Sequence, residues 1–396
     1  MKKEFLYLCL GAMLFSTACK PTSSTPTLMS AEDNKKLQEQ FITAKDGTTI
    51  EIPIGIYELD ASLTMDAVSN VIIKGQGTDK TILSFKNQKT GAEGIHVVGK
   101  NITIQDLTVQ DTKGDAIKVQ NTNGITMKNL KITWTAGSNE KNGGYGLYPV
   151  TCENVNIEKC DVSGASDAGI YVGQSKNIIV KDNYAHENVA GIEIENSDNA
   201  EVFNNKCFNN TGGILVFDLP ELPKKNGSGT KIHDNTILEN NHVNFAPEGN
   251  IVGITPAGSG IILLAAKKTE IYNNTITRNR SIGIAIASYP ITGKPYKDSL
   301  YIPLTSEINI HSNTFERTAK DEVDTTRDLG KMLYDVLESK LYDIVYDGIT
   351  VDNNKTNSMG ICIGKNTTNS DIRFANIDAA NKFQNVKKDI APYQCK

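Results

Sequence analysis

A four-residue motif recurs along most of the chain: a glycine or alanine, followed by residues that alternate between apolar and variable types. Uninterrupted copies begin 22 or 23 residues apart. A second alternating segment follows each copy, as at residues 101–104 and 177–180, and a third short segment follows a turn. Alternation with a period of two predicts β-strands. The copies begin at Gly94, Ala116, Gly146, Gly169, Gly191, Gly213, Gly260, Gly283 and Gly360.

Three short strands in each repeat predict one coil of a solenoid, because no two-residue Asn-Gly or Asp-Gly turn joins antiparallel partners at regular intervals. Each strand then pairs with its equivalent in the next coil, about 4.8 Å away. The predicted fold class is all-β: a single-stranded right-handed parallel β-helix with three strands in each coil of about 22 residues.

When the coils are aligned, asparagines recur at one turn position. The first coils have leucine or cysteine at this position instead. We interpret both asparagine columns as ladders that bond buried turn backbone, in preference to a polar ligand groove. The first column reads Leu107, Leu130, Cys160, Asn183, Asn205, Asn235, Asn274 and Asn313, and the second reads Asn188, Asn210, Asn240 and Asn279.

Two helices are expected beside the strands. Ser30 and the acidic residues after it resemble a helix N-cap, with Leu37 and Phe41 one turn apart, so residues 31–42 should form a helix that covers the first coil. A second apolar pattern of helical period predicts a helical insertion within residues 316–345. Residues 31–396 are therefore expected to form one β-helix domain.

The N-terminus has the features of an export signal. Two lysines precede an apolar stretch at residues 5–15, which is too short for an ordinary membrane-spanning helix. The small residues before Cys19 resemble a bacterial lipoprotein signal, although Ser16 departs from the usual leucine; ordinary signal cleavage nearby is the alternative. We expect residues 1–18 to be a signal peptide, Cys19 to be lipidated and residues 19–30 to be a tether. This predicts an exported lipoprotein at the outer membrane, facing the periplasm or the cell surface, and held at the membrane only by its lipid.

Composition excludes some classes of function. The net charge is -5, and no basic patch typical of nucleic-acid binding is present. No Cys-x-x-Cys motif occurs, which argues against a zinc ribbon or attached haem, so no cofactor or metal is expected. Five cysteines follow Cys19, so at least one should be unpaired if disulfides are intramolecular.

The opening segments at residues 52–57, 70–77 and 81–83 resemble the start of pectate-lyase-like β-helix proteins. The repeats at residues 45–378 resemble the superfamily of carbohydrate-binding and sugar-hydrolysis repeats, and in particular exported β-helix proteins of unassigned activity that are often lipoproteins. The resemblance implies a polysaccharide or oligosaccharide ligand. It also implies, as an alternative, a non-enzymatic periplasmic role beside an exported cytochrome-like redox protein or metalloprotein.

The catalytic signatures of related enzymes are missing. The chain lacks the polygalacturonase motif set, the Asp-Pro-His cluster of alginate epimerases and the acidic calcium cluster of pectate lyases. Asp111 with Asp115, and Asp161 with Asp167, are the nearest acidic pairs, and we assign them to turns. With no clear pair of catalytic carboxylates, lyase or epimerase chemistry is favoured over hydrolysis if the protein is an enzyme.

The third residue of each motif should point outward from the first sheet, where insertions at 136–144, 218–229, 239–258 and 288–305 interrupt the period. Two tyrosines in this column can stack on sugars, and either can act as an acid in β-elimination. The histidine or lysine can act as a base, and the glutamate as an acid or hydrogen-bond acceptor. The lysine can also neutralise a uronate. Ordinary surface positions are the competing interpretation. The candidate catalytic residues are His96, Lys118, Tyr148, Tyr171 and Glu193, followed by apolar Leu215, Ile262 and Ala285.

We predict that the mature protein begins at lipidated Cys19, because small residues precede this cysteine directly after the apolar stretch. Mass spectrometry of the N-terminal peptide should find a diacylglyceryl modification on Cys19. A free N-terminus downstream of residue 19 would rule the lipid anchor out.

Overall fold

The computed structural model describes residues 25–317, 323, 325–352, 357–368 and 371–395. Cys19 and the expected signal peptide lie outside the described residues. Within the described ranges, no helix combines the length and the apolar character needed to cross a membrane.

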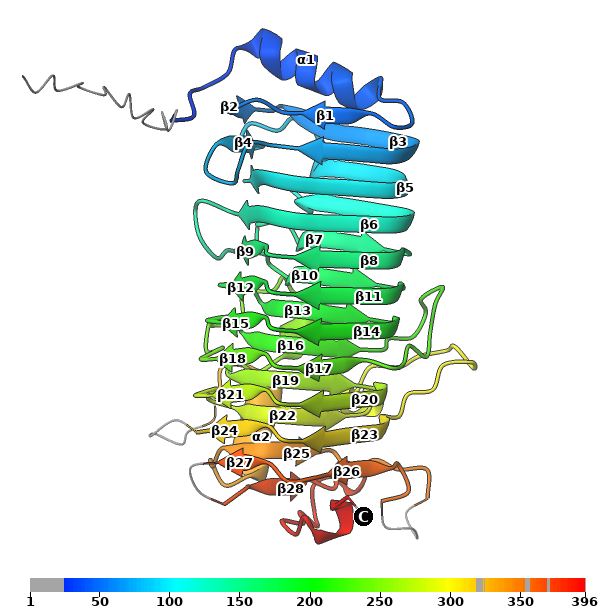
Figure 1. The fold of residues 1–396 in the computed structure, drawn as a ribbon. Helices are drawn as coiled ribbons and strands as arrows, with labels where there is room; N and C mark the ends of the chain where they lie inside the picture. Colours follow the sequence, from blue (N-terminus) through cyan, green and yellow to red (C-terminus); the bar gives the residue numbers. More distant parts are fainter. Residues whose placement is uncertain (1–24, 318–322, 324, 353–356, 369–370, 396) are drawn as a thin grey trace, which may run out of the picture.

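The strands form a stack of coils in which equivalent strands pair in parallel (Figure 1). The first coils contain long strands that bend around the solenoid, and β5 and β6 each pass through all three sheet positions. The first coils comprise the short strands β1 (Thr49–Glu51), β2 (Gly55–Glu58) and β4 (Thr81–Ser84) and the long strands β3 (Ala61–Lys74), β5 (Thr90–Gln110) and β6 (Ile117–Thr133).

Later coils divide into three separate strands, and each strand position forms its own sheet. The first sheet continues with β7 (Tyr145–Val150), β10 (Ala168–Gly173), β13 (Ala190–Glu195), β16 (Gly212–Phe217), β19 (Ser259–Leu264), β22 (Ile282–Ala287), β25 (Tyr342–Tyr346) and β28 (Phe374–Asn376). The second contains β8 (Glu153–Glu158), β11 (Lys176–Lys181), β14 (Asp198–Phe203), β17 (Lys231–His233), β20 (Lys267–Tyr272), β23 (Ser306–His311) and β26 (Ile361–Ile363). The third contains β9 (Asp161–Ser163), β12 (Tyr184–His186), β15 (Lys206–Phe208), β18 (Thr236–Leu238), β21 (Thr275–Thr277), β24 (Thr314–Glu316) and β27 (Thr367–Thr368).

Isoleucines at equivalent positions pack on each other inside the coils. Ile170 pairs in register with Ile192, and Ile192 with Ile214, and all three side chains are fully buried. Burying such a side chain contributes roughly 1.5–3 kcal/mol. The interior stack therefore fixes the register, because a slip by one residue would turn every apolar side chain outward.

Both predicted asparagine ladders are present. The Nδ2 atom of Asn183 donates to Oδ1 of Asn205 at 2.9 Å, and Asn205 donates in the same way to Asn235 at 3.0 Å. Asn205 also donates to the backbone oxygen of Val180 at 2.9 Å. The ladder continues one coil further than the sequence alignment, because Asn313 donates to Asn366.

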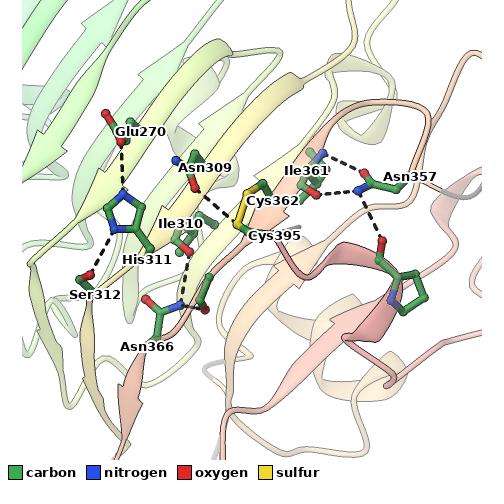
Figure 2. Close-up of a disulfide and its surroundings, with 12 residues drawn as sticks. Glu270, Asn309, Ile310, His311, Ser312, Asn357, Ile361, Cys362, Asn366 and Cys395 are labelled. Atoms are coloured by element: carbon green, nitrogen blue, oxygen red, sulfur yellow. Dashed lines mark hydrogen bonds and ion pairs between the residues drawn. A yellow bond between two sulfur atoms is a disulfide. The ribbon is translucent and has the colours of Figure 1, made fainter.

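The two ends of the solenoid are covered by different devices. Helix α1 (Ala31–Ile42) lies on the first coil, with Leu37 and Phe41 buried, and Ser30 and Asp33 form a capping box at its start (Figure 1). At the other end, the disulfide Cys362–Cys395 joins the C-terminal segment to β26 (Figure 2). The cysteines Cys152, Cys160 and Cys207 are buried and free, in agreement with the expectation that at least one is unpaired.

The predicted second helix is present inside the insertion. Helix α2 comprises Asp328–Val336 within the expected range of 316–345, and the last residues of that range, from Tyr342 on, already belong to β25. Tyr342 to Tyr346 pair with β22 because their alternating apolar residues continue the first sheet. The parallel β-helix with three strands in each coil, a capping helix and one helical insertion is as predicted.

We predict that replacing Asn205 or Asn235 with Leu lowers the free energy of unfolding by about 1–3 kcal/mol, because each change leaves buried backbone groups unpaired. Chemical denaturation of each variant provides the measurement. The exposed Asn87, changed to Leu, is the control and should leave the midpoint nearly unchanged. Unaltered midpoints for both ladder variants would contradict a structural role for the column.

Candidate functional site

The predicted outward column exists on the first sheet. His96 pairs in register with Lys118, and Lys118 with Tyr148. Tyr171 pairs with Glu193, and Glu193 with Leu215. The rings of Tyr148 and Tyr171 are 5.0 Å apart, so all five predicted site residues lie on successive coils of one face.

The column is open at one end and covered at the other. His96, Lys118 and Tyr148 are half-buried, whereas Tyr171 is 3% and Glu193 1% exposed. Val252 from the insertion before β19 and Leu333 from α2 belong to the apolar cluster that covers this end. The expectation that Tyr171 offers an exposed stacking surface is therefore wrong, although its side chain does point away from the solenoid interior.

A third tyrosine joins the predicted pair. The centroid of the Tyr145 ring lies 4.5 Å from the centroid of the Tyr148 ring and 4.4 Å from that of the Tyr171 ring. The Lys118 Nζ atom is 5.2 Å from the Tyr148 ring centroid, within the range of a cation–π contact, and 3.7 Å from Glu93 Oε1. The half-exposed Tyr148 thus lies between a cation and two further aromatic rings.

A glycine sets the position of Tyr171. A Cβ atom at Gly173 would lie only 2.3 Å from the Tyr171 hydroxyl, so a side chain there would displace the ring. The ring lies over Gly173 and its hydroxyl donates to Glu195 Oε1 at 2.6 Å. The sequence pattern could have revealed Glu195, because residues 193 and 195 share one face of a strand with a period of two.

Four carboxyl groups gather around the tyrosines, although the sequence analysis assigned two of them to turns. Asp115 and Asp167 lie beside each other, since a Cβ at Gly144 would be 3.6 Å from Asp115 Oδ1 and 3.9 Å from Asp167 Cβ. Backbone N–H of Tyr145 donates to Asp115 Oδ1 at 3.2 Å. The Nδ2 atom of Asn250 donates to Asp167 Oδ2 at 3.1 Å, which ties the insertion before β19 to this cluster. Both aspartates do lie in turns, shortly before β6 and β10, but Asp115 is half-buried and Asp167 buried, so they are not the solvated turn residues that we expected.

Burial raises the pKa of each of these carboxyl groups. Loss of water contact, followed by repulsion from Glu195 and Asp115, raises the pKa of Asp167 to about 7. Burial also raises the pKa of Glu195 to about 7, although the hydrogen bond from Tyr171 acts to lower it. Burial raises the pKa of Asp115 to about 6, although the charge of Lys118 acts to lower it. The pKa of Glu193 is raised by burial and then by Asp167 and Glu195. Protons are therefore held in this cluster near neutral pH.

Two buried polar atoms of the column have no hydrogen-bond partner among the described residues: Nε2 of His96 and Oε2 of Glu193. Unpartnered buried polar atoms are uncommon and mark places where a further donor or acceptor fits. No set of three or more His, Cys, Asp or Glu side chains in the described ranges is arranged to hold a metal ion.

Comparison with known proteins identifies the fold. The profile of the family described as "Right handed beta helix region" matches residues 69–221 and 138–253. No curated protein matches the sequence.

Three solved structures illustrate the structural similarity. A mutant of DFA-IIIase from Arthrobacter chlorophenolicus A6 is 12% identical, with a TM-score of 0.51 over 91% of this chain and 84% of that one. The A-module of the Azotobacter vinelandii mannuronan C-5 epimerase AlgE4 is 14% identical, with a TM-score of 0.49 over 87% and 92%. The catalytic unit of an α-1,3-glucanase from Streptomyces thermodiastaticus is 13% identical, with a TM-score of 0.47 over 91% and 57%. The profile and the similarity to DFA-IIIase show that the chain folds as a right-handed parallel β-helix.

Proposed function

We propose that the protein binds a polysaccharide across the open end of the first sheet and acts on it by proton transfer. The observation that carries this proposal is the contact between three tyrosines and four carboxyl groups, at the point where the open part of the sheet meets the covered part. Such a group of aromatic and proton-carrying side chains is costly to bury without a function.

The open end offers groups that suit a sugar chain. Tyr148 presents a half-exposed ring, and neighbouring His96 and Lys118 add polar and charged groups within two strand spacings. An aromatic ring with flanking polar groups provides both an apolar contact for a sugar ring and partners for its hydroxyls.

The protonation states favour lyase or epimerase chemistry. With a pKa of about 6, Asp115 is mostly ionised at neutral pH and can accept a proton, while burial raises the pKa of Tyr148 to about 12 and keeps its hydroxyl as a donor. Lys118 can neutralise a uronate carboxylate. Hydrolysis needs two carboxyl groups that flank the bond to be cut, but Glu193 and Glu195 are 1% and 7% exposed and lie under cover.

The proposal includes export and a lipid anchor at Cys19, which place the groove where extracellular polysaccharide is found. The alternative, docking of an exported redox protein or metalloprotein, draws its support from the sequence resemblance. Binding of a redox partner with no binding to any glycan would favour that alternative.

We predict that the protein loses stability as pH rises from about 4.5 to 7. Glu195 has a pKa of about 7 when folded and an ordinary value of 4.5, so the folded state holds its proton more tightly, and this stabilisation disappears as the pH passes through 7. The change of Glu195 to Gln keeps an acceptor for Tyr171 without a charge. This variant should be more stable than the unmodified protein at pH 8, by more than about 1 kcal/mol, and similar to it at pH 4.5.

Denaturant titrations at both pH values measure this difference. Glu51→Gln, at an exposed position of β1, is the matched control and should not reproduce it. An equal effect of Glu195→Gln at both pH values would show that Glu195 holds no proton near neutral pH.

We predict that Tyr148→Ala weakens glycan binding about fivefold or more, because it removes the exposed aromatic contact. A glycan array identifies the ligand, and calorimetry measures the change. Tyr171→Phe is the second variant, since it removes the hydroxyl without opening a cavity. Because Tyr171 is covered, this variant should leave glycan binding nearly unchanged.

Tyr184→Ala, at a 53% exposed tyrosine of the third sheet, serves as the control. New ultraviolet absorbance would report elimination products, and new reducing ends without it would report hydrolysis. If Tyr148→Ala stays folded and binds as tightly as the control, the groove is not the ligand site.

A further inference from the structure

A large cleft lies beside the tyrosine and carboxyl cluster. Its volume is about 890 Å³, and it is lined by parts of the insertions at 136–144, 239–258 and 288–305, together with Arg327 just before α2. These insertions interrupt the coils before β7, β19 and β25 and after β22, so segments far apart in sequence converge over the first sheet. The insertions were predicted from the sequence, but the cleft between them was not.

Three cations from three of these segments face the cleft: Lys141, Lys294 and Arg327. None of them forms an ion pair with a carboxylate of the described residues, unlike Lys118, which pairs with Glu93. Two lining acids, Glu140 and Glu248, are exposed. The lining therefore carries a small net positive charge, and among the described residues the side chains of Arg327 and Lys294 donate only to the backbone oxygens of Asn244 and Gly249, so the cleft is electrostatically suited to an anion.

Arg327 is held in place before any ligand arrives. Its guanidinium donates to the backbone oxygen of Asn244. Asn244 is itself buried, and its Nδ2 atom donates to the backbone oxygens of Val252 and Thr255, both at 2.9 Å. The planar guanidinium keeps further donors free for a carboxylate or sulfate, and a fixed position reduces the entropy lost on binding.

The cleft is continuous with the candidate site through Asn250. This residue lines the cleft, and its amide donates to Asp167 of the carboxyl cluster. Asn250 therefore connects the cleft to the carboxyl cluster beside Tyr148. Ser138 and Asn139 add polar side chains for sugar hydroxyls on the same wall.

We propose that this cleft is a second subsite, which binds the carboxylate or sulfate group of a sugar unit next to the one over Tyr148. The inference rests on the proposed function, and it assigns the substrate to the anionic polysaccharides. Lys141 and Lys294 attract the anion, and Arg327 fixes its orientation.

The test compares galacturonate and mannuronate hexasaccharides with the same chains after reduction of their carboxylates to alcohols. Calorimetry with the full protein should show at least about tenfold tighter binding of an acidic chain than of its reduced form, corresponding to about 1.4 kcal/mol. The double variant Lys141→Gln, Lys294→Gln should remove most of this preference. Arg327→Lys, which keeps the charge but loses the planar fork, should reduce it in part.

Lys297→Gln is the matched control, because this lysine lies on the same insertion as Lys294, is exposed, and does not line the cleft. Equal affinity for acidic and reduced chains, with a loss on Tyr148→Ala, would overturn the subsite and leave the proposed function intact. A preference for the acidic chain that survives the double variant would also overturn it. Failure of every chain to bind would reject both proposals.

Discussion

The hydrogen bonds of the asparagine ladders are the constraint on which the coiled structure depends. Each coil must turn sharply between its second and third strands, and the turn buries backbone groups that neither sheet can pair. In Asn183, Asn205 and Asn235, one side chain accepts from the N–H of the coil before it and donates to a backbone oxygen. One residue type therefore satisfies the buried backbone and aligns the next coil, which explains why the column tolerates so little variation once it begins.

The first coils solve the same problem in another way. Leu107 and Leu130 occupy the ladder position there, and β5 and β6 run continuously through the bend, so that their backbone groups remain in sheet pairing. Cys160 marks the change, because its backbone N–H donates to Oδ1 of Asn183. The candidate site lies close to this transition. The insertion before β7 lies at the coil where separate strands replace the continuous ones. It ends at Gly144, directly before Tyr145 at the start of β7.

The repeat predicted the parallel coils, the outward column and both ladders, because a residue's environment is fixed by its equivalents about 22 residues away. The two helices were predicted from an N-cap and from apolar residues at helical spacing. The burial of Tyr171 could not be predicted in this way, because it belongs to an apolar cluster that includes Val252 and Leu333, far along the chain. The burial of Asp167 escaped prediction for the same reason: an aspartate in an isolated turn is solvated, whereas here Asn250 of a distant insertion contacts its carboxylate.

The covered carboxyl groups connect stability to the chemistry of the site. Apolar side chains above β10 and β13 would give the more stable packing. Leu215 and Ile262 occupy the equivalent positions of β16 and β19 in this way. Here Glu193, Glu195 and Asp167 instead remain buried close together, and their mutual repulsion is relieved by bound protons. The change from polar to apolar along one column occurs at the coil where Glu193 gives way to Leu215. Since the cover and the interior are continuous across that boundary, packing alone does not account for the acidic side, whereas the proton transfer that we propose next to the open groove does.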